Sequence, residues 1–212
     1  MANINAPFGM RPVGSFTGAP YMGRVSRYYI ISSDPNAYYE GDAVISAADA
    51  DANGVPGVIK ATAGTETCRG IIVGFEQANL VYPPGASPTL GGTGVNIFPT
   101  QVSIPATKNQ DYYALVADDP NVVFFMQGDA TATNQVSTKV NNNATFTVAA
   151  PGTATMPTSA SVVNSANIAT TATLNIKLMG LAQIPGNTFG AYATWVCMWN
   201  LHELSGAGVL GV

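Results

Sequence analysis

The sequence holds few residues suited to catalysis, and its only histidine, His202, is the first to consider. General-base catalysis and metal binding need a histidine together with partners at fixed positions. The neighbouring acid is Glu203, and adjacent residues on a strand point to opposite faces of a sheet. We therefore interpret His202 as a polar strand end with local hydrogen bonds, and we predict that the protein is not an enzyme.

Two carboxylate pairs resemble acid–base or calcium sites, but both patterns are typical of turns. Asp118-Asp119 is followed by Pro120-Asn121, which favours a turn. Asp49 and Asp51 begin a pattern found in calcium loops, yet the twelfth position, where such loops have glutamate, is Lys60. We predict no catalytic residue, no metal and no cofactor.

A glycine-rich run and three tyrosine pairs bear on binding functions. The run Gly91-Gly92-Thr93-Gly94 lacks the lysine of a phosphate loop. The pairs are Tyr28-Tyr29, Tyr38-Tyr39 and Tyr112-Tyr113. Tyrosine pairs on strands usually divide between core and interface, although they also suit a sugar-binding platform. A carbohydrate-binding or adhesion β-module therefore stays open as an alternative.

Composition narrows the classes further. Only 9% of the 212 residues are charged, against roughly 25% in an ordinary soluble domain, and the net charge is −4. Eight scattered basic residues do not form a phosphate-binding surface, so we expect no nucleic-acid partner. No run approaches the ~20 apolar residues of a membrane span, so we expect no membrane partner either. A surface with so few charged residues indicates that much of it is covered in an assembly, with an unusual soluble domain as the alternative.

The same composition predicts the fold class. Long amphipathic helices need Lys, Glu and Arg on their wet face, and these residues are scarce. Short apolar runs separated by turn signals such as Asn53-Gly54 favour strands. This pattern favours a sandwich or a barrel, with a jelly roll among them, and the fold that we predict is an all-β, jelly-roll-like β-sandwich with an extended N-terminal arm. The expected strands are 27–32, 42–46, 55–61, 70–76, 95–98, 112–117, 122–127, 145–148, 174–180 and 192–200.

Within this fold, we predict one domain over residues 28–212. The runs 112–117 and 122–127 are expected to pair as a hairpin around the Asp118–Asn121 turn. Residues 129–172 are low in complexity and are expected to form surface loops, with a short helix or a loop at 130–140.

The run Tyr192–Asn200 carries the largest cluster of bulky apolar side chains, on both of its faces. Such a strand belongs in the middle of a sandwich or between subunits. We therefore assign Trp195, Met198 and Trp199 to the core or to self-association. Cys68 and Cys197 stand in apolar strand contexts and are expected to be free core thiols, with a disulfide left as the less favoured alternative.

Residues 1–27 are interrupted by Pro and Gly, which excludes a helix or a long strand. A disordered tail would not usually carry so many large apolar groups. We predict an arm that lies on a partner, with an arm folded back on its own domain as the alternative. The start of the chain lacks the pattern of a signal peptide. The candidate contact residues are Phe8, Arg11, Val13, Phe16, Tyr21, Arg24 and Arg27.

Several stretches, in order, resemble the cement (decoration) proteins of tailed-bacteriophage capsids, especially of the short-tailed kind. They are residues 1–13, Tyr28–Ile30 leading to Gly41–Val44, Tyr112–Asn121, and Leu178–Leu181 through Pro185–Asn187 to Asn200–His202. The resemblance spans most of the chain, while 129–172 matches only in general character.

The resemblance implies a virion structural protein, made in the host bacterial cytoplasm, that binds the capsid exterior. It would clamp neighbouring subunits of the major capsid protein and associate with itself, with a homodimer favoured and a trimer as the alternative. The net negative charge fits an outer face away from packaged DNA. The alternatives are the major capsid protein itself, which usually has a long charged helix, and a glycan-binding or host-adhesion module of the virion.

Overall fold

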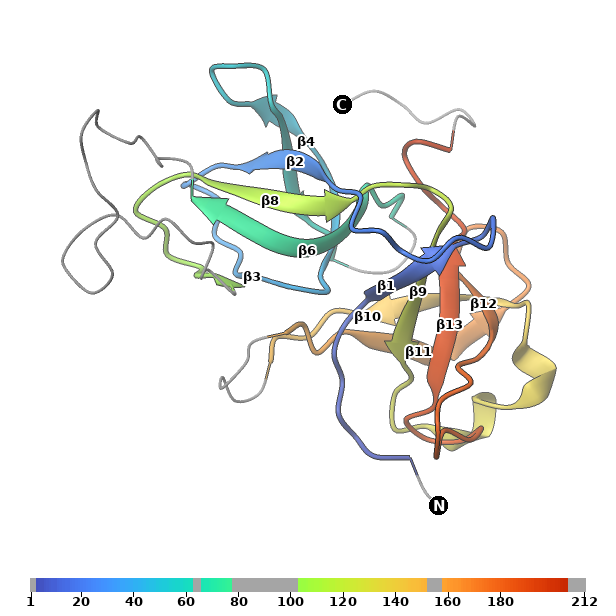
Figure 1. Cartoon of the computed structure of the whole chain (residues 1–212). Helices are drawn as coiled ribbons and strands as arrows, with labels where there is room; N and C mark the ends of the chain where they lie inside the picture. Colours follow the sequence, from blue (N-terminus) through green and yellow to red (C-terminus); the bar gives the residue numbers. More distant parts are fainter. Residues whose placement is uncertain (1–2, 63–65, 78–102, 152–157, 206–212) are drawn as a thin grey trace.

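The computed structural model describes residues 3–62, 66–77, 103–151 and 158–205, and almost all of their regular structure is β-strand (Figure 1). The helical segments described are two 3-10 turns, η1 (Ala132–Asn134) and η2 (Ser137–Lys139). The strands are β1 (Arg11–Ser15), β2 (Ser26–Ile30), β3 (Tyr38–Tyr39), β4 (Ala43–Ala50), β5 (Pro56–Lys60), β6 (Gly70–Gln77), β7 (Ser103–Ile104), β8 (Tyr112–Ala117), β9 (Val122–Gln127), β10 (Asn143–Thr147), β11 (Val162–Ala169), β12 (Ile176–Leu181) and β13 (Thr194–Trp199).

One group of strands closes into a five-stranded barrel in the order β2-β5-β4-β6-β8. Its pairings are antiparallel except for β2 with β5, which are parallel at Tyr29 and Gly57. The tyrosine pairs split across the barrel wall as their alternation requires. Tyr28 and Tyr112 belong to the barrel core, whereas Tyr29 and Tyr113 lie outside that core with their rings 6.0 Å apart.

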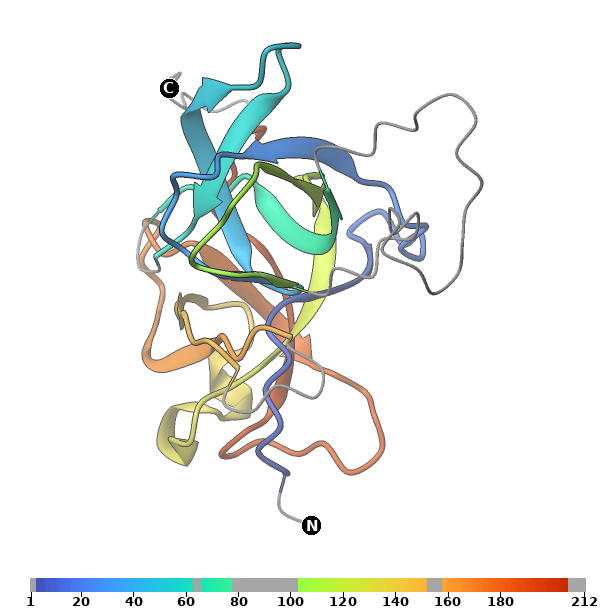
Figure 2. The ribbon, with the colours of Figure 1, turned by 90° about the vertical axis from the view of Figure 1, so that its left-hand side faces the viewer.

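The other large sheet has the order β1-β9-β13-β12-β10-β11 and is antiparallel throughout. An isolated bridge between Gly128 and Val163 brings β11 back toward the end of β9. The sheet therefore curls around its own core. A small third sheet pairs β3 with β7. Figure 2 shows the barrel above the six-stranded sheet.

The core of the six-stranded sheet reaches into the barrel. Trp195, Cys197 and Trp199 on β13 are buried in one cluster with Phe124 and with barrel residues such as Ile71. The second cluster fills the barrel interior. The two groups of strands are thus joined by shared apolar packing. Burying apolar surface stabilises a fold by about 25 cal/mol for each Å² removed from water, and it is the main favourable term in folding.

The prediction of an all-β protein is confirmed, and its packed, mostly antiparallel sheets are consistent with a sandwich. The finer expectation of a jelly roll is not confirmed, because the described strands form a closed barrel and a curled six-stranded sheet. Most expected strands occur within a few residues of their predicted bounds. The expected strand 95–98 and the glycine run at 91–94 lie outside the described residues.

The predicted hairpin between β8 and β9 is wrong. The turn itself is present, because the Asn121 amide donates to Asp119 Oδ1 at 2.8 Å. However, β8 pairs with β2 and β6, whereas β9 pairs with β1 and β13. The turn instead carries the chain from the barrel into the six-stranded sheet, which the local sequence does not distinguish from a hairpin.

The prediction of surface loops at 129–172 is also wrong in part. The eight-residue strand β11 lies there and buries Val163 and Ile168. Its residues alternate poorly because Asn164 and Ser165 interrupt the apolar pattern. The possible helix at 130–140 is represented only by η1 and η2.

Candidate interaction surface

The N-terminal segment is part of the protein body, which corrects the prediction of an extended arm. Arg11–Ser15 forms β1, which pairs with β9 in register from Arg11 with Phe125 to Ser15 with Val122. A bulge at Val13 interrupts the ladder. Without β1, the backbone N–H and C=O groups along this edge of β9 would have no partner, and β1 supplies that partner. The alternative of a segment folded onto its own domain is therefore what the structure shows.

Residues 3–10 form a strap that leads into β1. The Gln127 amide holds its backbone from both sides, donating to Ile4 O at 2.9 Å and accepting from the Ala6 amide at 3.1 Å. Asn3 contacts the loop before β13 by donating to Thr188 O and Ala191 O, each at 2.8 Å. The strap is thus held by hydrogen bonds to the side-chain amides of Asn3 and Gln127 instead of by the backbone pairing of a β-strand.

The strap ends in a tight crossing beside the barrel. Met10 is buried in the shared core, and its amide donates to Gly41 O at 2.9 Å. Gly9 and Gly41 both have positive φ, and a Cβ on Gly41 would lie 2.8 Å from Phe8 O. Glycine is required there because the two backbones approach within contact distance.

Beyond β1, the turn at residues 16–24 projects apolar side chains into solvent. Phe16 is 60% exposed and Met22 is 84% exposed, and Arg24 is exposed beside them. Backbone bonds fix the base of the turn, from the Phe16 amide to Asn121 O at 2.8 Å and from the Ser15 amide to Ala19 O at 2.8 Å. We call residues 16–24 the exposed turn.

The exposed turn encloses a shallow cavity of about 230 Å³ against the connection between β8 and β9. Tyr21 lines it, packs against the shared core and donates its hydroxyl to Arg24 O at 3.1 Å. These contacts fix the base of the turn, so its apolar and cationic groups are presented at a defined place on the surface.

The predicted contact residues divide into three groups. Arg11, Phe16 and Arg24 are exposed, and neither arginine forms an ion pair with any described residue. Phe8, Val13 and Tyr21 are half-buried and contribute mainly to packing. Arg27 is already engaged within the chain: its Nε lies 3.1 Å from Glu76 Oε2, and its guanidinium stacks 3.5 Å from the centre of the Tyr113 ring. Arg27 is thus a poor choice for a partner contact.

The three residues assigned to the core or to self-association, Trp195, Met198 and Trp199, lie on two different faces of β13. Trp195 and Trp199 are buried and belong to the core. Trp195 donates its indole N–H to Gln135 at 3.3 Å, and Trp199 packs against Phe124 with ring centres 5.1 Å apart. Met198 points to the opposite face of the sheet and is half-buried.

Sequence reasoning missed Met22, Asn3 and Gln127. Met22 has no periodic pattern around it, because the exposed turn is not a regular element. Asn3 and Gln127 act through pairings more than 120 residues apart along the chain. Their residue types alone, two amides in a chain rich in amides, give no signal for that partnership.

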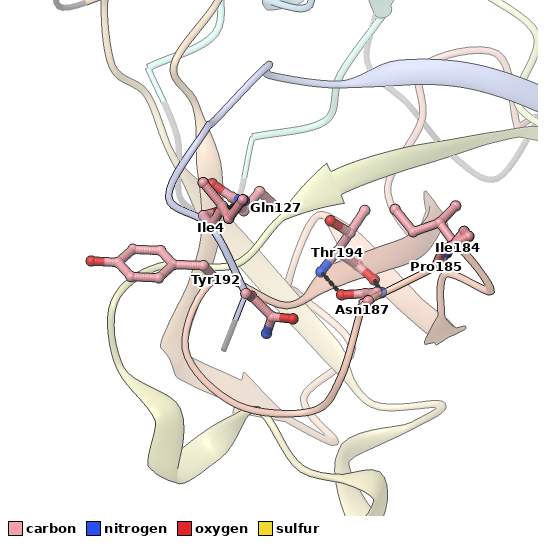
Figure 3. A pocket seen from close by; sticks show the side chains of 9 residues that line it. Ile4, Gln127, Ile184, Pro185, Asn187, Tyr192 and Thr194 are labelled. Atoms are coloured by element: carbon pink, nitrogen blue, oxygen red, sulfur yellow. Dashed lines mark hydrogen bonds between the residues drawn. The ribbon is translucent and has the colours of Figure 1, made fainter. Parts of the chain in front are cut away.

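A larger pocket of about 410 Å³ lies beside the strap (Figure 3). Ile4 and Tyr192 line it on one side, and Ile184 and Pro185 line it on the other. Its amides are used within the chain: Asn187, for example, exchanges hydrogen bonds of 2.8 and 2.9 Å with the Thr194 backbone. Glycan sites need polar groups free to bind hydroxyls, so this pocket suits an apolar group better.

The residues considered for catalysis are placed in structural roles. His202 is buried and accepts a hydrogen bond from the Leu204 amide at its Nδ1, 3.1 Å away. Burial lowers the pKa of His202 to about 4, with Glu203 opposing that shift. No group of three or more metal-ligating side chains occurs among the described residues.

The other residues considered for metal binding or nucleophilic chemistry are hydrogen-bonded within the chain or buried. Asp51 accepts hydrogen bonds from the Asn53 and Val55 amides, each at 2.8 Å, as a turn residue does. Cys68 and Cys197 are free and fully buried, and burial raises the pKa of each thiol above its usual range. A thiol held protonated is a poor nucleophile.

Comparison with known proteins adds no relative: no family model, no curated protein and no solved structure matches this chain. Within the described part of the chain, no helix is long and apolar enough to cross a membrane.

Proposed function

We propose that the protein is a virion structural protein of the cement or decoration type, which binds the outer surface of a phage capsid and clamps neighbouring major capsid subunits. The observation that carries the proposal is the exposed turn. Backbone hydrogen bonds fix its base, and its exposed side chains Phe16, Met22 and Arg24 belong to neither core, whereas Tyr21 packs against the shared core.

The sequence supports the same class through its low charge and its resemblance to capsid cement proteins. A capsid repeats each contact many times, so contacts that are weak individually can still hold a shell together through avidity. The partner surface best suited to the exposed turn would be apolar with nearby carboxylates, which complement Arg11 and Arg24.

The role of residues 1–27 changes in this proposal. Removing residues 2–22 would delete Met10 from the core and β1 from its sheet, so it would test folding rather than binding. The contact is made by the exposed turn, while the strap and β1 hold that turn in place.

The test is co-sedimentation of the purified protein with capsid shells assembled without it. The double variant Phe16→Ser/Met22→Ser should bind about tenfold or more weakly, because apolar anchors at an interface centre dominate affinity. The matched control is Ile184→Ser, an exposed isoleucine beside the pocket at the other end of β9. All variants should keep the thermal midpoint of the wild type.

Saturable wild-type binding, with shells that then rupture at a higher temperature, would support the cement role. Absence of binding by the wild type would discard it. Equal binding by the turn variant and the wild type would exclude the exposed turn as the contact and leave the class of function open.

A further inference from the structure

The outer face of the six-stranded sheet carries an apolar row that belongs to neither core. Residues directly opposed on neighbouring strands share a face. Val123 lies opposite Met198, and Phe125 lies opposite Val196. All four side chains are half-buried, and none is in the buried set of either hydrophobic cluster. Their neighbours Phe124 and Cys197 point into the core instead.

This face is open among the described residues. Gly180 pairs with Val196 across β12 and β13, and a Cβ built on Gly180 meets no atom within 4 Å. At one end the face borders the strap: Gln127 and Thr194 are buried there, the strap is held against Gln127, and both residues line the 410 Å³ pocket. An exposed apolar surface beside such a pocket is typical of a protein-binding site.

The charges bordering the face are all positive. Arg11 lies opposite Phe125, and Lys177 lies opposite Met198. The strands β1, β9, β12 and β13 contain no Asp or Glu. Neither cation forms an ion pair with a described residue. A partner for this face should therefore be acidic.

The barrel of the same chain carries the complementary charge. Its basic residues are already paired, as Arg27 with Glu76, Lys60 with Asp42, and Lys108 with Asp34. Three further carboxylates lie beside Tyr29 and Tyr113, which are themselves buried in the barrel wall. Asp111 lies near both tyrosine hydroxyls, Asp49 lies near that of Tyr29, and Asp51 accepts a hydrogen bond from that of Tyr113. The Arg27 guanidinium lies over the Tyr113 ring, but its charge is paired with Glu76, so Asp49, Asp51 and Asp111 remain as an excess of negative charge. We call these three residues the barrel acidic group.

We propose that copies of this chain associate head to tail, with the barrel acidic group of one copy docked on the outer face of β9, β12 and β13 of the next. Such a heterologous contact leads to a ring if the rotation closes and to a chain if it does not. It therefore differs from the two-fold dimer favoured by the sequence, in which the same patch meets itself. The inference stands apart from capsid binding, since it is tested on the purified protein alone.

The test uses two variants that each disable one half of the contact. Gly180→Glu places a carboxylate on the open sheet face, and Asp111→Lys reverses one charge of the barrel acidic group. Each alone should weaken self-association in sedimentation velocity by about tenfold or more, because like charges oppose each other across the contact. Mixed together, they should form a one-to-one pair, since each retains the half that the other lacks.

The matched control is Thr138→Glu, which adds the same charge at an exposed position in the 3-10 turn η2, outside the strands of this face. It should associate as the wild type does. Raising the salt concentration should weaken the wild-type contact, a readout that involves no substitution. A wild type that stays monomeric at the highest soluble concentration would overturn the proposal. So would two variants that associate normally, or a mixture that remains monomeric.

Discussion

At the scale of single residues, burial explains the shifted pKa of the one histidine, His202. His202 lies under Trp199 with ring centres 6.0 Å apart, and its Nε2 is buried without a hydrogen-bond partner among the described residues. The nearby charges are Arg69, Glu203 and Asp118, and Arg69 also donates to the Tyr28 hydroxyl at 2.7 Å. A neutral imidazole fits this site, because Nδ1 must be unprotonated to accept from the Leu204 amide and because burial would remove the hydration of a charged ring.

This burial makes stability depend on pH in a predictable direction. The pKa of His202 falls from 6.5 to about 4 on folding, so between these values only the unfolded chain binds the proton. The free energy of unfolding should therefore decrease as the pH falls from about 6.5 to about 4, by at most about 3 kcal/mol. Urea unfolding followed by tryptophan fluorescence measures it.

The variant His202→Gln separates this effect from that of other groups, such as Asp42, whose carboxyl pKa is raised by burial. The difference in unfolding free energy between wild type and variant should shrink as the pH falls through this window. If the unfolding free energies of the wild type and of His202→Gln change in parallel from pH 7 to pH 4, the pH dependence does not come from His202.

At the scale of elements, the central and edge strands of the six-stranded sheet behave differently. β13 is central and buries one face completely, so its sequence alone identifies it. β1 is an edge strand of five residues with Pro12 and Gly14, and it depends on its neighbours. The strap before it depends on Gln127 in turn.

Replacing Gln127 with alanine should release the strap. Two hydrogen bonds to the backbone of residues 4–6 would be lost, each contributing about 1 kcal/mol. We expect faster hydrogen exchange at the Ala6 amide and a loss of stability of about 1–2 kcal/mol.

Gln183→Ala is the matched control, because Gln183 is exposed and its amide bonds only to the nearby Leu181 O at 3.0 Å. It should leave the Ala6 amide protected. If Gln127→Ala also leaves that amide protected, the strap is held by other contacts and the amide clamp is not its anchor.

At the scale of the whole molecule, the barrel and the six-stranded sheet share one apolar cluster. Ala43, Cys68 and Ile71 come from the barrel side, and they pack in the cluster that holds the β13 tryptophans. The C-terminal residues strengthen the joint, because the Glu203 amide donates to Cys68 O at 3.0 Å and Glu203 lies 3.6 Å from Arg69.

We therefore expect the two groups of strands to unfold in one cooperative step. Ile71→Ala should lower stability by about 2–5 kcal/mol and shift the whole transition. Tryptophan fluorescence reports the six-stranded sheet, and exchange at barrel amides such as that of Val58 reports the barrel. Both should move together, while the exposed-site control Ile59→Ala should change little. Separate transitions would show that the two groups are independent.

The sequence by itself determined what depends on local composition and alternation. The scarcity of charge excluded long helices, and the runs at 112–117 and 122–127 matched β8 and β9 to the residue. The apolar alternation of Tyr192–Asn200 marked β13 as a core strand. These properties follow from side-chain chemistry within a few residues, and sequence displays that directly.

The tertiary structure alone decided which strands are neighbours. β8 and β9 adjoin in sequence yet lie in different sheets, and β1 joins β9 across more than 100 residues. It also decided that Arg27 pairs with Glu76, whereas Arg11 and Arg24 have no ion-pair partner in the described part of the chain. Strand pairing and charge pairing are set by burial and hydrogen bonding summed over the whole chain, and a local pattern carries no information about a distant partner.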